Sequence, residues 1–133
     1  MNDGAGIVIV IDDDQDVRDL LSLIANEKGF EAWQARDCKE GMEQMRRAGD
    51  RLALVLLDYF MPGMPPIDCC RAVLQLAGRQ VEVVLVTAAV DPAERARTIG
   101  LRHWVGKPFS IDSIDWVWRL AAARTSQPES VTT

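Results

Sequence analysis

The sequence is short of cysteine, histidine and basic residues, and each shortage excludes a class of protein. The three cysteines, Cys38, Cys69 and Cys70, are odd in number and show neither a CxxC motif nor a Cys/His metal spacing. We therefore expect reduced thiols packed on helices and no disulfide framework. A net charge of −5 and a pI near 4.8 exclude a nucleic-acid-binding surface, which needs clustered lysine and arginine.

Long apolar runs are also missing. No run approaches the roughly 20 residues that a membrane-spanning helix needs. The apolar run 7–11 is too short for a signal peptide, has no basic segment before it and leads into three acids. We expect a cytoplasmic protein with no membrane segment. Its 133 residues, 48% hydrophobic and 26% charged, suit one globular domain.

Apolar runs alternate with amphipathic segments along the chain, which predicts an α/β sheet with right-handed crossovers. The predicted strands are 7–11, 30–35, 52–57, 81–86 and 103–105. The predicted helices are 14–28, 37–48, 67–77, 92–98 and a last one that Ser110 or Asp112 caps and that runs to about Arg124. No repeat or second domain is visible, so we expect one domain over residues 1–124 and a disordered tail or linker over 125–133.

Three of the predicted strands end on polar side chains. Asp12 and Asp13 follow the first strand, Asp58 follows the third and Thr87 follows the fourth. The carboxyl ends of parallel strands meet at one edge of an open α/β sheet, which is where ligands bind, so we expect these groups to converge. Asp14 is the best candidate to cap the first helix.

Neighbouring carboxylates repel one another unless solvent or a cation compensates, and a hard cation is their natural partner. Mg²⁺ takes oxygen ligands and usually keeps several waters, so Asp13, Asp58 and the backbone carbonyl of Phe60 are sufficient protein ligands. The composition of this edge therefore points to metal or phosphoryl chemistry.

Two further segments border the same edge. Lys107 begins a loop after the last strand, where its ammonium faces the acids and can clamp a phosphoryl group. Thr87 offers a hydroxyl, and the small side chains of Ala88 and Ala89 leave an approach open.

In this order, the motifs resemble the receiver domains of bacterial two-component response regulators. The matching features are Asp12-Asp13, Asp58 in the segment Leu57-Asp58-Tyr59-Phe60-Met61-Pro62-Gly63, Thr87-Ala88, Trp104, and Lys107-Pro108-Phe109. The resemblance covers about residues 6 to 124. It implies a five-stranded parallel sheet in the order 2-1-3-4-5, flanked by five helices.

The resemblance also implies a role for each matching residue. Asp58 would be the phosphoacceptor, and Trp104 would be an aromatic switch. The Mg²⁺ site would consist of Asp12, Asp13, Asp58 and the Phe60 carbonyl. The phosphoryl group would be contacted by Thr87 and Lys107. The implied partner is a sensor histidine kinase or a phosphotransfer protein. Such a module catalyses only its own phosphorylation and dephosphorylation, and it signals through the surface of its fourth helix, fifth strand and fifth helix, to a second copy or to a downstream effector.

The chain departs from the family pattern in the turn after Asp58. Pro65-Pro66 replaces a common Asp-Gly and stiffens the entry to the third helix. Phe60 is aromatic where smaller or polar residues are common, and its ring should exclude the water that removes a phosphoryl group. We expect Phe60, with Ala88 and Ala89, to tune the kinetics.

One aromatic residue of the last helix has no place in the predicted core. A helical wheel that starts at Ile111 puts Ile114, Trp118, Ala121 and Ala122 on the core side. Trp116 lies opposite, either as a surface residue or as an anchor for a partner.

Other functions compete with this interpretation. A phosphatase of the haloacid-dehalogenase type needs a second aspartate two residues after the nucleophile, where this chain has Phe60. A flavin mononucleotide site needs a phosphate-binding loop after the first strand, where this chain has three acids. His103, the only histidine, begins a predicted strand and does not suit a phosphorelay histidine. An interaction module that is never phosphorylated remains open, and a phosphodonor assay separates these functions.

Overall fold

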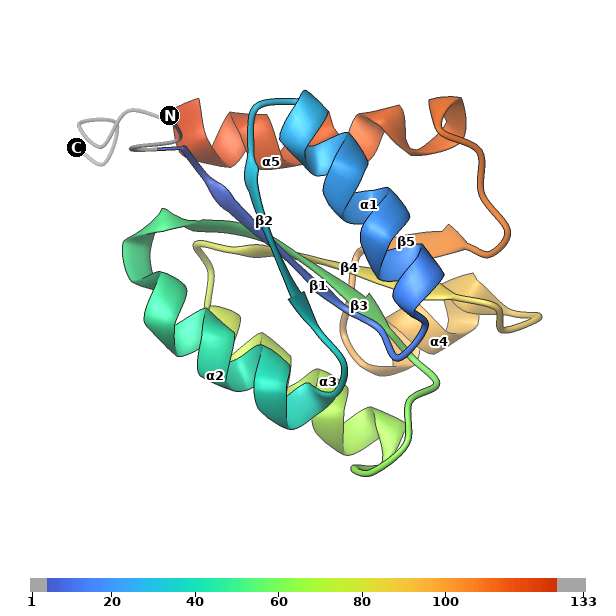
Figure 1. The fold of residues 1–133 in the computed structure, drawn as a ribbon. Helices are drawn as coiled ribbons and strands as arrows, with labels where there is room; N and C mark the ends of the chain where they lie inside the picture. Colours follow the sequence, from blue (N-terminus) through green and yellow to red (C-terminus); the bar gives the residue numbers. More distant parts are fainter. Residues whose placement is uncertain (1–4, 127–133) are drawn as a thin grey trace.

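The computed structural model describes residues 5–126, in which strands and helices alternate (Figure 1). The strands are β1 (Ile7–Ile11), β2 (Glu31–Ala35), β3 (Leu52–Asp58), β4 (Glu82–Thr87) and β5 (His103–Gly106). The helices are α1 (Gln15–Glu27), α2 (Cys38–Ala48), α3 (Pro66–Ala77), α4 (Pro92–Thr98) and α5 (Asp115–Ser126). All neighbouring strands pair in parallel in the order β2-β1-β3-β4-β5, which confirms the predicted fold.

The central strands are buried on both faces because their side chains alternate between two hydrophobic cores. On one face, α2, α3 and α4 pack against Ile7, Ile9, Ile11, Val55 and Leu57. On the other face, α1 and α5 pack against Val8, Val10, Leu54 and Leu56. Figure 1 shows the resulting three layers, with α1 and α5 above the sheet and α2 and α3 below it.

The predicted cap of the first helix forms as expected, and an aspartate caps the second helix in the same way. The Asp14 carboxylate accepts hydrogen bonds from the backbone N–H groups of Asp16 and Val17, and that of Asp37 accepts one from Glu40 N–H. Asp91 precedes α4 as its cap residue, but its side chain makes no capping hydrogen bond and instead pairs with Arg95 at 3.3 Å. Of the three consecutive acids, Asp14 therefore caps α1, whereas Asp12 and Asp13 remain at the edge of the sheet.

The start of the last helix differs from the prediction. A 3₁₀ turn, Asp112–Ile114, precedes α5, so the helical wheel that began at Ile111 has the wrong origin. Ile111 is 57% exposed, whereas Ile114, Trp118 and Ala121 are buried as expected and Ala122 is exposed. Trp116 is half-buried and packs against the core and the His103 ring.

The end of the domain is only partly described. Helix α5 extends to Ser126, two residues into the segment that we expected to be a tail, and the rest of that segment lies outside the described residues. No helix in the described range combines the length and apolar character that a membrane span requires.

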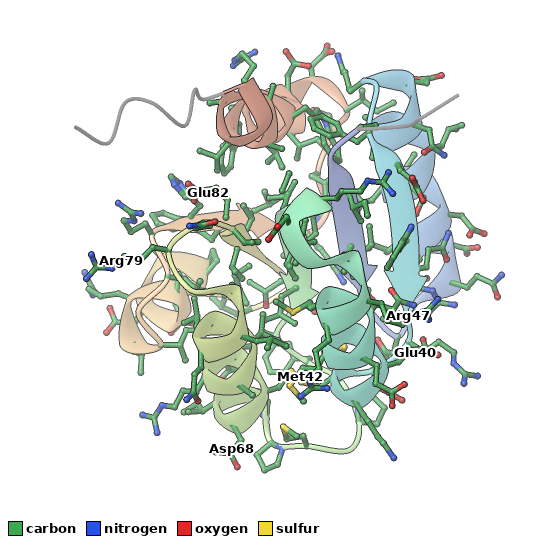
Figure 2. All side chains as sticks on the ribbon, turned by 90° about the vertical axis from the view of Figure 1, so that its left-hand side faces the viewer. Glu40, Met42, Arg47, Asp68, Arg79 and Glu82 are labelled. Carbon is green, nitrogen blue, oxygen red and sulfur yellow. A yellow bond between two sulfur atoms is a disulfide. The ribbon has the colours of Figure 1, made fainter. Side chains whose placement is uncertain are left out.

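The cysteine prediction is wrong for two of the three residues. Cys38 and Cys69 form a disulfide, while Cys70 is a buried free thiol. Figure 2 shows α2 and α3 side by side with Met42 between them, and this packing places the Cα atoms of Cys38 and Cys69 6.0 Å apart. That separation suits a disulfide. The sequence carries no such signal, because only the fold brings together cysteines that are 31 residues apart.

Candidate functional site

The carboxyl edge of the sheet gathers the predicted acidic residues. Asp58 is the last residue of β3, and Asp12 follows β1, which pairs with β3. One carboxylate oxygen from each of Asp12, Asp13 and Asp58 lies within 4.8 Å of the others. The predicted convergence of these three acids is therefore present in the structure.

The three acids differ in burial. Asp12 is 2% exposed and Asp58 is 5% exposed, whereas Asp13 faces solvent. Asp12 Oδ1 accepts a hydrogen bond from Asp14 N–H at 2.9 Å, and Asp58 Oδ1 accepts one from Phe60 N–H at 3.4 Å. These backbone donors fix the turns after β1 and β3, so the carboxylates are held in place before any ligand arrives.

Lys107 supplies the positive charge of the site. Its Nζ donates to Asp12 Oδ2 at 2.8 Å and lies 3.6 Å from Asp58 Oδ1. Burial alone would lower the pKa of the ammonium, but the hydrogen bond to Asp12 and the charges of Asp58 and Asp12 outweigh it and raise this pKa. Lys107 thus stays charged and bridges the two buried acids, as its place after β5 predicted.

The fold makes ionisation of Asp58 unfavourable. Burial, and then the charge of Asp12, raise its pKa to about 6, against the opposing effects of Lys107 and the Phe60 N–H group. Such a carboxylate holds its proton more tightly than a solvated one, and a nearby cation would displace that proton.

Thr87 and the residues after it form the next part of the edge. Thr87 is fully buried at the end of β4, and its hydroxyl oxygen accepts a hydrogen bond from Ala89 N–H at 3.0 Å. The Thr87 carbonyl accepts a hydrogen bond from Lys107 N–H at 2.7 Å, which ties the lysine to this strand end. Ala88 is exposed and Ala89 is half-buried, and their role in leaving an approach to the site stays a prediction.

The two aromatic residues predicted to act at the site, Phe60 and Trp104, are both partly exposed. The Phe60 ring is 49% exposed and packs edge-on against Tyr59, with the Arg95 guanidinium over both rings. Trp104 is 40% exposed on β5, where it pairs with Leu85 of β4. No contact ties Trp104 to the acids in the described part of the chain, so its switching role stays a prediction.

Sequence reasoning missed Arg18, which holds the backbone of Asp12 in place. Arg18 is 8% exposed, and its Nη1 donates to the backbone carbonyl of Asp12 at 2.8 Å while its Nε donates to the Gln34 side chain. The signal was a charged residue one turn before Leu21 and Ser22 on the buried side of α1. Such a residue on a core-facing stripe needs a polar partner.

The donor set suits a hard divalent cation. All three side chains offer carboxylate oxygens, and three negative charges face the single ammonium of Lys107. Mg²⁺ prefers oxygen donors of this kind and keeps waters in its remaining positions. Asp12, Asp13 and Asp58 therefore fit such an ion, and one of them, Asp58, is a buried carboxylate with a raised pKa.

Comparisons with known proteins agree with this geometry. Sporulation initiation phosphotransferase F of Bacillus subtilis is 28% identical over 109 residues, covering 80% of this chain and 86% of the relative. Sensory transduction protein RegX3 of Mycobacterium tuberculosis is 32% identical over 106 residues, covering 77% of this chain. The chain spans only 44% of the length of RegX3.

Solved structures share the fold. Chemotaxis protein CheY4 of Vibrio cholerae superposes with a TM-score of 0.75 at 22% identity, over 86% of this chain and 97% of that one. Response regulator TrrA of Thermotoga maritima superposes with a TM-score of 0.72 at 24% identity, over 86% of this chain and 98% of that one. The profile of the response regulator receiver domain matches residues 8–117. The chain therefore belongs to the response regulator receiver domain family, and its buried aspartate cluster fits a phosphoacceptor site.

Proposed function

We propose that this signalling module accepts a phosphoryl group on Asp58 in a Mg²⁺-dependent reaction. The observation that carries the proposal is the buried Asp58 carboxylate, which lies beside Asp12 and Asp13 and 3.6 Å from the Lys107 ammonium. The donor would be a sensor histidine kinase or a phosphotransfer protein in the cytoplasm. The structure of TrrA is of a complex with Mg²⁺-BeF, which supports a magnesium-dependent site in this chain also.

The transfer balances without a separate catalyst. An Asp58 oxygen forms a bond to phosphorus, the bond between phosphorus and the donor breaks, and the donor leaves with the electron pair, so Asp58 becomes an acyl phosphate. A bound Mg²⁺ would neutralise charge on the acceptor and the phosphoryl oxygens. Lys107 is placed to hold a phosphoryl oxygen as a point charge, and the Thr87 hydroxyl is the further donor at this edge.

The signal would leave through the surface of α4, β5 and α5. Trp104 is exposed on β5, and Trp116 of α5 packs beside His103, the residue before Trp104 on that strand. A change at Thr87 on phosphorylation would reach β5 through its hydrogen bond with Lys107. We propose that this surface then binds a second copy or an effector, with Trp116 contributing part of its area.

The direct test of this function is a phosphodonor assay. Purified chain is mixed with acetyl phosphate or phosphoramidate, with Mg²⁺ or with EDTA, and its intact mass is measured. We expect an increase of about 80 Da with Mg²⁺ and none with EDTA. No increase in either condition would support the interaction module that is never phosphorylated, and steady release of phosphate without a labelled intermediate would support a phosphatase.

A second prediction concerns the lifetime of the phosphoryl group. Phe60→Asn removes the ring beside the acceptor and admits the attacking water, so dephosphorylation should accelerate by roughly tenfold, or about 1.4 kcal/mol of barrier. The rate is measured from the decay of the phosphorylated mass after the donor is removed. Met64→Asn, which changes another exposed apolar residue of the same loop, is the control and should leave the rate unchanged. A Phe60→Asn rate equal to or slower than that of the unchanged protein would refute the shielding role.

A further inference from the structure

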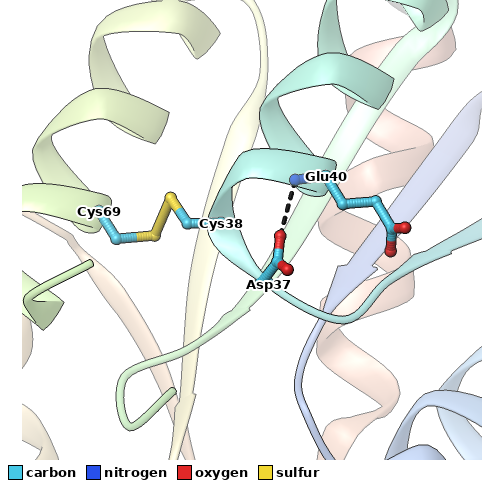
Figure 3. The surroundings of a disulfide bond; sticks show 4 residues. All are labelled: Asp37, Cys38, Glu40 and Cys69. Atoms are coloured by element: carbon cyan, nitrogen blue, oxygen red, sulfur yellow. Dashed lines mark hydrogen bonds between the residues drawn. A yellow bond between two sulfur atoms is a disulfide. The ribbon is translucent and has the colours of Figure 1, made fainter. Parts of the chain in front are cut away.

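The disulfide lies in the core that supports the acidic site. Cys38 is the first residue of α2 and Cys69 lies in the first turn of α3, and both helices begin at the carboxyl edge of the sheet. Figure 3 shows the bond joining the two helix starts, beside the hydrogen bond from Glu40 N–H to Asp37 that caps α2. Both cysteines share one hydrophobic core with Ile11 and Leu57, the residues that immediately precede Asp12 and Asp58.

The third cysteine, Cys70, is a buried free thiol. Burial, and then the charge of Asp58, raise the pKa of the Cys70 thiol to about 11. Cys70 lies in α3, one residue after the bonded Cys69, and its side chain belongs to the same hydrophobic core. A buried thiol with a raised pKa is unreactive, so any redox chemistry in this core belongs to Cys38 and Cys69.

Disulfides are rare in the cytosol, and those that form there are usually transient and redox-sensing. We propose that Cys38 and Cys69 are a reversible redox modification site, and that their oxidation clamps the first turn of α3 and the preceding loop against α2. That loop, Tyr59 to Pro65, contains Phe60 and lies between Asp58 and the Cys38–Cys69 bond, which we call the clamp. The effect on phosphoryl chemistry rests on the function proposed above, whereas the redox step does not.

The redox step is a thiol–disulfide exchange. Each thiol loses one proton and one electron as the bond between the two sulfurs forms. A small-molecule disulfide such as oxidised glutathione takes up the two protons and two electrons and leaves as two thiols. Both cysteines are at most 5% exposed, so exchange requires local opening at the start of α2 or α3. A dithiol reverses the reaction.

The consequence follows from where the bond is anchored. In the oxidised chain, the loop is fixed at one end by β3 and close to its other end by the bond to α2. In the reduced chain, this covalent link between the start of α3 and α2 is absent. We therefore expect slower amide exchange in this turn, and slower loss of a phosphoryl group from Asp58, in the oxidised chain.

The first experiment tests the redox site without phosphorylation. Chain treated with oxidised glutathione should weigh about 2 Da less than chain treated with dithiothreitol, with Cys38 and Cys69 blocked to alkylation. Oxidation should raise the thermal midpoint by roughly 10 °C, since the bond closes a loop of about thirty residues. Cys38→Ser and Cys69→Ser should abolish both changes, and Cys70→Ala should retain them. A bond that does not form, or that dithiothreitol cannot reduce in the folded chain, would overturn the proposal.

The second experiment tests the clamp. Hydrogen–deuterium exchange should slow by at least about tenfold at the start of α3 and in residues 59–65 of the oxidised chain, and the phosphorylated mass should decay more slowly than in the reduced chain. Cys38→Ser should show neither difference. A chain that oxidises with unchanged exchange in this region would refute the clamp. A clamp seen in exchange, in a chain that no phosphodonor labels, would refute the proposed function and leave the redox site standing.

Discussion

Asp58→Asn is expected to make the metal-free protein more stable at about pH 7.5, by about 3 kcal/mol. Burial and Asp12 raise the pKa of folded Asp58 from 3.8 to about 6. Because the folded state binds this proton more tightly than the unfolded state, the associated stability is present below the unfolded pKa and is lost as pH rises through the folded pKa. Asparagine carries no charge, so the variant avoids that loss.

Urea denaturation in EDTA between about pH 5 and pH 8 checks this prediction. The stability gained by Asp58→Asn should shrink as pH falls, because protonation relieves the unchanged protein. Asp13→Asn is the control, since Asp13 is exposed and its change should have a small effect. Equal or lower stability of Asp58→Asn at pH 8 would mean that the ionised carboxylate is not unfavourable in the fold.

Lys107→Met should make the metal-free protein less stable. Removing the ammonium leaves the buried Asp12 and Asp58 facing each other without a cation, and breaking such a buried pair costs about 3–5 kcal/mol. The free energy of unfolding in EDTA measures the loss, and added Mg²⁺ should restore part of it, because the ion supplies the missing positive charge.

The matched control for Lys107 is Lys28→Met. Lys28 pairs with Asp115 at 3.0 Å, but both side chains are more than 40% exposed. Surface pairs of this kind contribute about 0–1 kcal/mol, so this change should be small. Equal losses in the two variants would show that Lys107 is not a buried counter-charge.

The fold and the acids at its edge were predictable because short-range rules decide them. Apolar runs that end on Asp12, Asp58 and Thr87 read directly as buried parallel strands, and the geometry of such a sheet then brings their ends together. The capping role of Asp14 was equally clear, since a cap depends only on the next few residues.

The features that sequence reasoning missed depend on packing between distant elements. The wheel of the last helix failed because a 3₁₀ turn changes the rotation per residue after Ile111. Arg18 is accommodated on the buried side of α1 because the Asp12 carbonyl and the Gln34 side chain accept its hydrogen bonds. The pairing of Cys38 with Cys69 arises from the contact between α2 and α3, which no local spacing encodes.

The most direct measurement of the central claim compares the unchanged protein with Asp58→Asn in the Mg²⁺-dependent phosphodonor assay. The mass of the unchanged protein should increase by about 80 Da and that of the variant should not, while the variant remains folded by circular dichroism. Labelling of the variant to the same extent, with the same dependence on Mg²⁺, would place the phosphoryl group on another residue and contradict the account.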